Sequence, residues 1–299
     1  MRILIMVLMM GILAACGNGA DEAATLPPER VESEAKAFQR RIFFVTEDEE
    51  RLDLLAFEHT VLARETEVER GATLWHLGEE GWKSLIELAW EDQPIREPWR
   101  IVPHGPLRII VDDTGELLAL RLRTPHGNGR LSATTIVDEW TPNSLESLSV
   151  QEGEWVIGTD TARGLLVDII PKGSPSGSTS TDLTELVLSS GDEFRLTAIL
   201  PSGESGQIWV QRLTLAPETF DGVGTFVGAG TGSAPWHLDA RGGELRGELS
   251  PLGEDLELVL EPLFSDSTSG GVIYQPVSGW IEVRGDRRSV IGLLRREGS

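Results

Sequence analysis

Apolar and polar residues alternate along most of the chain beyond its N-terminal segment, and this alternation predicts β-structure. Glu116–Arg123 is the clearest case, with Leu118, Leu120 and Leu122 at every second position. Successive side chains of a strand point to opposite faces, so a strand with one buried face has a period of two. Such segments recur about every 8 to 12 residues with turn residues between them, as in sandwiches and barrels. We therefore predict an all-β fold of roughly sixteen to eighteen strands in antiparallel barrels or a curved sandwich.

Three hairpins are predicted in the first half of the chain. They join Arg41–Val45 to Arg51–Phe57, Leu74–Leu77 to Trp82–Trp90, and Leu107–Val111 to Glu116–Arg123. Thr46–Glu49 also fits a helix capping box, so a helix is the alternative to the first hairpin. The β-branched and aromatic residues before that box favour the hairpin. The other strands are expected at Thr60–Glu69, Leu131–Val137, Glu154–Ile157, Leu165–Ile170, Leu183–Leu188, Phe194–Leu200, Gln207–Leu215, Trp236–Asp239, Glu244–Leu249, Leu256–Leu260, Gly279–Arg284 and Ser289–Arg295. Of these, the first is expected to be largely exposed.

A short N-terminal helix is predicted before the strands, at Glu29–Gln39. Val31, Ala35 and Phe38 are spaced so that they share one helix face, and Pro28 suits the start of a first turn. Such a helix is either a lid over a sheet edge or a stalk.

A low-complexity loop at Lys172–Thr181 interrupts the strand pattern. It is either a linker between two β units or a long hairpin loop. We take it as the division and predict β units at residues 29–172 and 182–299. A glycine-rich stretch, Gly222–Gly232, is expected to be a structural loop, because it lacks the Gly-Lys-Ser/Thr ending of a phosphate-binding loop.

The N-terminal segment has the pattern of an export signal. Arg2 precedes an apolar run, Ile3–Ile12, which leads into Leu13–Cys16 with the only cysteine of the chain. The run is too short for a membrane span, which needs roughly 20 apolar residues. A lone cysteine in an exported protein has no partner within its chain for a disulfide, so another use for Cys16 is expected.

Leu13–Cys16 resembles the lipobox of bacterial lipoproteins. The resemblance implies that residues 1–15 are a signal peptide, removed just before Cys16, and that Cys16 carries at least a diacylglyceryl group. Two acyl chains make membrane binding stable where one is marginal. Residues 16–28 then form a lipidated tether with a span on the order of 20 Å. The implied location is the bacterial cell envelope, and Gly17 favours the outer membrane by analogy with Gram-negative sorting, with the body facing the periplasm or the cell surface.

The negative charge of the chain argues against partners that are themselves strongly negative. The full sequence has 48 acidic and 26 basic residues, a balance of −22. Loss of the signal would remove Arg2, so the balance becomes 25 − 48 = −23. Nucleic acids and anionic lipid surfaces are bound through clustered Lys and Arg, so we expect no nucleic-acid partner. The acyl anchor is then the expected membrane attachment.

Catalytic motifs are not found in the sequence. The five histidines have no metal-ligand spacing, and no nucleophile elbow or His-Glu-x-x-His occurs. The sequence therefore supports no catalytic residue, metal or cofactor. Asp112–Gly115 is expected to be an ordinary turn, with Ca²⁺ binding as the alternative. His104 and His126 lie in Pro/Gly-rich connectors, and both are expected to face one barrel mouth.

Nine tryptophans are the remaining feature of the composition. Core packing is the default for a buried tryptophan, but a cavity for an apolar ligand would use the same side chains. The candidate ligand-binding residues are Trp99, His104, His126, Trp140 and Trp236.

The C-terminal strands resemble those of a known family. Pro235–Leu238, Glu244–Pro251, Tyr274, Ser278–Val283 and Ile291–Leu294 are similar in rhythm to the closing strands of hydroxyneurosporene-synthase-like double-lipocalin proteins. The aromatic motifs expected early in that family are missing, so its hydratase activity is not carried over. The front half resembles the open half-barrels of lipoprotein-localisation proteins and related lipid-binding lipoproteins.

These resemblances imply a curved antiparallel sheet around an apolar ligand, in a lipocalin-like fold. The first functional hypothesis is a binding module for a lipid or other apolar small molecule. A structural or interaction lipoprotein of the envelope is the second. An enzyme acting on an apolar substrate is the third, and it requires His104 or His126 beside a carboxylate.

Overall fold

The computed structural model describes most of the strand-forming part of the chain. The described residues are 36–46, 51–63, 67–92, 104–124, 127–142, 146–172, 183–191, 193–201, 206–212, 215–225, 236–245, 248–249, 255–263, 266–269 and 271–297. The predicted signal peptide, Cys16, the tether and the Pro-rich connector before His104 lie outside them. Within the described part, no helix has the length and apolarity required to cross a membrane.

The described residues form strands joined by turns and loops, and the all-β prediction is confirmed. The first sheet contains β1 (Lys36–Thr46), β2 (Leu54–Ala63), β3 (Val68–Gly78), β4 (Gly81–Asp92), β5 (Leu107–Val111), β6 (Leu117–Thr124), β7 (Gly127–Trp140), β8 (Glu146–Ile157) and β9 (Asp160–Pro171). The second contains β10 (Leu183–Ser190), β11 (Phe194–Pro201), β12 (Gly206–Arg212), β13 (Glu218–Thr225), β14 (Trp236–Leu245), β15 (Glu248–Leu249), β16 (Asp255–Pro262), β17 (Ser267–Ser269), β18 (Val272–Val283) and β19 (Asp286–Glu297).

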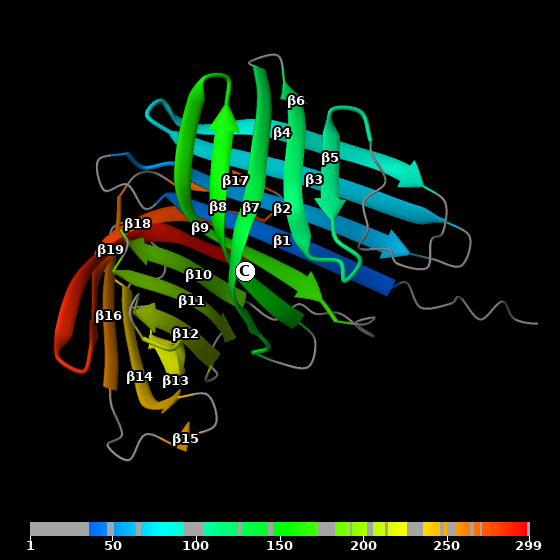
Figure 1. Ribbon diagram of the computed structural model, residues 1–299. Helices are drawn as coiled ribbons and strands as arrows, with labels where there is room; N and C mark the ends of the chain where they lie inside the picture. The colour runs from blue at the N-terminus through cyan, green and yellow to red at the C-terminus, as the bar shows by residue number, and fades with distance from the viewer. Residues whose placement is uncertain are drawn as a thin grey trace, which may run out of the picture. The chain divides into compact units, whose positions relative to one another are not determined.

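Both sheets are curled and antiparallel (Figure 1). The strand order is β4-β3-β2-β1-β9-β8-β7-β6-β5 in the first and β13-β12-β11-β10-β19-β18-β16-β14-β15 in the second. In each sheet the first strand pairs with the last long strand, β1 with β9 and β10 with β19. The chain therefore returns to its starting strand twice. The division at Lys172–Thr181 into two folding units stays a prediction, since both sheets belong to one compact unit, residues 34–299.

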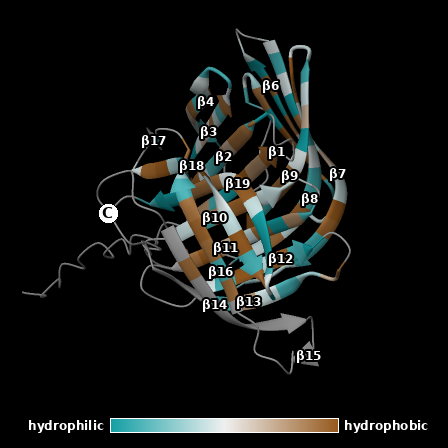
Figure 2. Cartoon of the chain, turned by 90° about the vertical axis from the view of Figure 1, so that its left-hand side faces the viewer, coloured by the Kyte–Doolittle hydropathy of each residue, from teal (hydrophilic) through white to brown (hydrophobic). Residues whose placement is uncertain are grey.

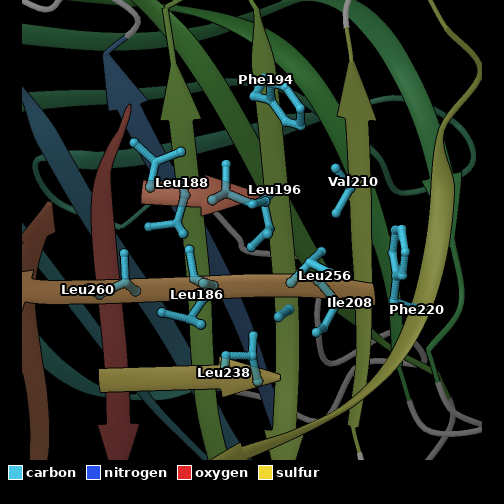
Figure 3. Packing of buried hydrophobic residues seen from close by; sticks show 14 of the residues in the cluster. Leu186, Leu188, Phe194, Leu196, Ile208, Val210, Phe220, Leu238, Leu256 and Leu260 are labelled. Atoms are coloured by element: carbon cyan, nitrogen blue, oxygen red, sulfur yellow. The ribbon is translucent and has the colours of Figure 1, made fainter. Parts of the chain in front are cut away.

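Three large apolar clusters and one small one hold the described strands together. One lies on the inner face of the first sheet, including Ile42 and Phe44, and one on the inner face of the second, including Leu186 and Leu188 (Figure 3). The third takes members from both sheets, such as Phe43 of β1 and Leu293 of β19. The central strands are thus apolar on both faces, whereas strands nearer the edges alternate, as around β6 in Figure 2.

A buried ionic network accompanies the third cluster. Arg41 of β1 lies 2.7 Å from Glu185 of β10, and Arg295 of β19 lies 2.5 Å from Glu58 of β2. Arg295 also lies 3.3 Å from Glu185, and the Tyr274 hydroxyl donates to Glu58 at 2.5 Å. Burial raises the pKa of Glu185, because its charged form is desolvated. Burial also opposes ionisation of Glu58, but the charge and hydrogen bond of Arg295 hold its pKa below the ordinary value. The network therefore joins the two sheets by ion pairs.

The predicted hairpins are confirmed as β1–β2, β3–β4 and β5–β6, but two other elements are corrected. The helix prediction for Glu29–Gln39 is wrong over Lys36–Gln39, which begins β1, while the rest lies outside the described residues. Phe38 pairs with Val61 of β2 and both are buried, so pairing along β2 overrides the local helical spacing.

Thr60–Glu69 is not a single strand. Thr60–Ala63 ends β2 and Val68–Glu69 begins β3, on either side of residues 64–66, which are outside the described part. Val61 and Val68 are both buried, against Phe38. The prediction of a largely exposed strand is therefore wrong: the few apolar residues of this segment point inward from the two strands of a hairpin.

Close approach of β9 to β1 gives a first prediction. A Cβ added to Gly164 would lie 2.0 Å from the Val45 carbonyl oxygen, which belongs to the paired backbone and cannot move aside easily. We expect Gly164→Ala to lower the free energy of unfolding by about 2 kcal/mol or more, as overpacking does. Urea denaturation measures the free energy of unfolding. Ser84→Ala is the control, because Ser84 is an exposed residue of β4. A loss below about 0.5 kcal/mol at Gly164 would contradict the register of β1 and β9.

Candidate functional site

The inner face of the first sheet is apolar except for a line of polar side chains. Five neighbouring strands contribute one residue each: Asp92 from β4, Arg70 from β3, His59 from β2, Arg40 from β1 and Asp168 from β9. We call these five residues the polar row. Arg40 shares the inner face with Ile42 and Phe44 of β1 because the side chains alternate along the strand. His59 is directly opposite Arg40 in the register of β1 and β2.

Arg40 and Asp168 form a buried ion pair with two hydrogen bonds. Arg40 Nε donates to Asp168 Oδ1 at 2.9 Å, and Nη2 donates to Oδ2 at 2.6 Å. Both side chains are 0% exposed. The backbone N–H of Leu117 also donates to Asp168, at 3.3 Å. The third guanidinium nitrogen, Arg40 Nη1, is buried and has no hydrogen-bond partner among the described residues.

His59 lies between the two arginines of the polar row and is neutral. Arg70 Nη1 approaches His59 Nε2 at 3.5 Å, and Arg70 Nε pairs with Asp92 at 2.9 Å. Burial, followed by the charges of Arg70 and Arg40, lowers the pKa of His59 to about 3. A guanidinium can only donate, so Nε2 is the acceptor and the ring proton of His59 belongs on Nδ1. That Nδ1 is buried and has no hydrogen-bond partner in the described part of the chain.

An aromatic stack covers one side of His59. The rings of His59 and Trp90 lie 6.2 Å apart with a 13° angle, and those of Trp90 and His104 lie 4.5 Å apart with a 9° angle. Backbone hydrogen bonds in both directions with Leu107 hold His104 in place. Trp90 and His104 are partly exposed while His59 is buried. The stack therefore runs from solvent to the polar row.

Further polar atoms lie on or near this face, toward β6 and β8. Burial, then a hydrogen bond and the charge of Glu139, raise the pKa of Glu116 to about 7. Glu116 Oε2 and Gln151 Oε1 have no hydrogen-bond partner among the described residues. Asp112 uses its carboxylate inside the predicted turn, where Oδ1 accepts from the N–H groups of Thr114 and Glu116 at 2.9 Å each.

Of the residues predicted as ligand-binding, His104 is the one that the structure places beside the polar row. Trp140 ends β7 and belongs to the cluster between the sheets, on the other face. Trp236 begins β14 of the second sheet, opposite Leu260. Trp99 and His126 lie outside the described residues, so a common mouth for His104 and His126 stays a prediction. A common site for His104, Trp140 and Trp236 stays a prediction.

Sequence reasoning missed the polar row itself, although a signal for it exists. Phe38, Arg40, Ile42 and Phe44 fall on every second position, which places a charge on an otherwise apolar strand face. Asp168 likewise interrupts the apolar run of β9. A charge at a buried strand position requires a partner, so the two residues were candidates for a pair. No group of three or more potential metal ligands is found among the described residues.

Two solved structures are similar to this chain over most of its length. Kievitone hydratase from Nectria haematococca matches with a TM-score of 0.53 and 11% identity, over 89% of each chain. An AttH protein from Nitrosomonas europaea matches with a TM-score of 0.49 and 9% identity, over 89% of this chain and 92% of its own. No family model and no curated protein matches the sequence. With its two curled antiparallel sheets and the likeness to the hydratase, the chain has an all-β, lipocalin-like fold.

Proposed function

We propose that this protein is a lipid-anchored protein of the bacterial cell envelope that binds a lipid or other apolar small molecule on the inner face of its first sheet. One observation carries the proposal: buried polar atoms of Arg40 and His59 stand without protein partners among the described residues, on an otherwise apolar face. Small-molecule sites have this composition, since apolar walls provide affinity and a few polar groups fix orientation. The partly exposed stack of Trp90 and His104 supports a path from solvent to them.

Mass spectrometry of an organic extract of the purified protein tests the binding function. We expect a co-purifying apolar molecule in about equimolar amount. Ala72→Trp is the matched variant, because Ala72 is the buried partner of His59 on β3 and an indole there would fill the inner face. The extract of the folded variant should lack the molecule. A wild-type protein without any apolar ligand, but with protein partners in pull-down experiments, would instead fit an interaction lipoprotein of the envelope.

The membrane anchor rests on the lipobox resemblance of Leu13–Cys16 and has its own test. We expect Cys16→Ser to move the protein from the membrane fraction to the soluble fraction, because the variant has no thiol to acylate. Labelling with radioactive palmitate should mark the wild type and not the variant. Retention of Cys16→Ser in membranes would overturn the anchor while leaving the binding function to be judged by the extract.

An acid–base enzyme acting on an apolar substrate is the second candidate, and Glu116 favours it. A carboxyl group with a pKa of about 7 exchanges protons at neutral pH, as general acids and bases do. Glu139 is the neighbouring carboxylate and is exposed. The similar structure from Nectria haematococca is named a hydratase, but at 11% identity this likeness extends to the fold alone.

The raised pKa of Glu116 makes a prediction about stability. The folded protein keeps this proton up to pH about 7, whereas the unfolded chain releases it near the ordinary value of 4.5. The contribution of Glu116 to stability is therefore present at low pH and is lost as the pH rises from about 4.5 through 7. We expect Glu116→Gln to flatten the fall of Tm across this window, as thermal melts at successive pH values would show. Parallel profiles for both proteins would contradict the assigned pKa.

A further inference from the structure

Two buried polar atoms without a partner among the described residues belong to side chains that are directly opposite in the register of adjacent strands. Arg40 and His59 are opposite one another on β1 and β2, and each residue is 1% exposed. Arg40 Nη1 and His59 Nδ1 have no hydrogen-bond partner among the described residues. An unsatisfied buried donor costs about 1–3 kcal/mol, so a ligand that accepts from both would remove two such costs.

Both atoms are donors, which defines the chemistry that satisfies them. Asp168 occupies Nε and Nη2 of Arg40, and this leaves Nη1 as a charged N–H group. Arg70 approaches Nε2 of His59, and this leaves Nδ1–H as a neutral donor. The group that completes the pair therefore has to be an acceptor, and an acceptor with two oxygens matches two donors.

The charged donor Arg40 Nη1 favours an anion over a neutral acceptor, because hydrogen bonds between charged groups are stronger than neutral ones. The polar row itself has no excess positive charge, since Arg40 is paired with Asp168 and Arg70 with Asp92. A buried position also strengthens a charge-assisted hydrogen bond relative to one in water.

From these observations we propose that the inner face of the first sheet binds an apolar molecule with a carboxylate head, held by Arg40 Nη1 and His59 Nδ1. The apolar part of the ligand lies against the cluster that contains Phe57 and Leu74, and Trp90 covers His59 from the side of solvent. This inference rests on the proposed binding function and names its ligand class. The head is distinguished from other oxygen groups by its charge and its two acceptor atoms.

Three probes of equal chain length test the head group: dodecanoate, 1-dodecanol and methyl dodecanoate. The full chain carrying Cys16→Ser is titrated with each by calorimetry at pH 7.4, below the micellar concentration. The alcohol and the ester are the more hydrophobic probes, so an apolar site without the donor pair would prefer them. We expect dodecanoate to bind at least about tenfold more tightly than either. If the alcohol or ester binds as well as the acid, the carboxylate assignment fails and apolar binding stands; if none of the three binds, both fail.

His59→Phe assigns the preference to the donor pair. Phenylalanine keeps a ring beside Trp90 but has no N–H, and the Arg40–Asp168 pair remains. We expect the preference for the acid to fall below about threefold while the alcohol binds as before. His76→Phe is the matched control on β3, because that histidine pairs with Asp53 at 3.0 Å and is not part of the polar row. An unchanged acid preference in His59→Phe, with circular dichroism of a folded protein, would overturn the role of His59.

Discussion

Replacing Arg295 by methionine is expected to destabilise the protein by about 3–5 kcal/mol, the range found when one partner of a buried ion pair is removed. Arg295 is 1% exposed and lies between Glu58, at 2.5 Å, and Glu185, at 3.3 Å. Without it, two buried glutamates from different sheets keep only Arg41 as a nearby cation in the described network. The pKa of Glu185, already raised by burial, should rise further. Urea denaturation at pH 7 measures the loss.

A second variant separates the loss of charge from the loss of packing. Arg295→Met combined with Glu58→Met removes the main ion pair and leaves apolar side chains of similar length. We expect this double variant to be more stable than Arg295→Met alone, because the uncompensated charge of Glu58 is gone. Arg287→Met, whose guanidinium lies over the Trp280 ring and is 54% exposed, is the control for an exposed arginine and should cost less than about 1 kcal/mol. Equal losses in all three variants would contradict a buried network between the sheets.

Replacing Arg40 by methionine is expected to have an effect of the same size, about 3–5 kcal/mol, on the first sheet. Asp168 would keep the hydrogen bond from the Leu117 N–H, at 3.3 Å, but would lose its only ion-pair partner among the described residues. A carboxylate at 0% exposure without a cation either protonates or unfolds the strands around it. Chemical denaturation at pH 7 should show the loss.

The paired replacement makes this prediction specific. Arg40→Met with Asp168→Leu replaces both charges by apolar groups on an apolar face, so most of the stability should return. The same double variant should lose the preference for dodecanoate, because Arg40 Nη1 is one of its two donors. A double variant that is as unstable as Arg40→Met would show that the ion pair does not account for the loss.

The hairpins and the strand-rich class were predictable because both depend on short stretches of sequence. Alternation reports which face of a strand is buried, and turn residues such as those at Asp112–Gly115 mark its ends. The helix predicted at Glu29–Gln39 is wrong over Lys36–Gln39. Three apolar residues at helical spacing were enough to suggest it, but Phe38 also fits the alternating inward face of β1, and pairing with β2 decided the outcome over Lys36–Gln39.

The candidate site was predictable only in part. His104 was one of the predicted ligand-binding residues, and the structure places it against Trp90 of the inner face. Arg40, His59 and Asp168 were missed because each is unremarkable in its own strand. Trp140 was predicted to bind ligand because it is a large aromatic residue. In the structure it packs in the cluster between the sheets.

The sequence by itself determined that the chain forms antiparallel strands, where many of them begin and end, and which residues point the same way along each. Only the tertiary structure decided that β1 pairs with β9, which brings Arg40 to Asp168 across 128 positions, and that Arg295 reaches Glu58 across 237. The physical reason is range. Alternation depends on residues that are close in sequence, whereas a buried charge is stabilised only by the partner that long-range strand pairing brings to it.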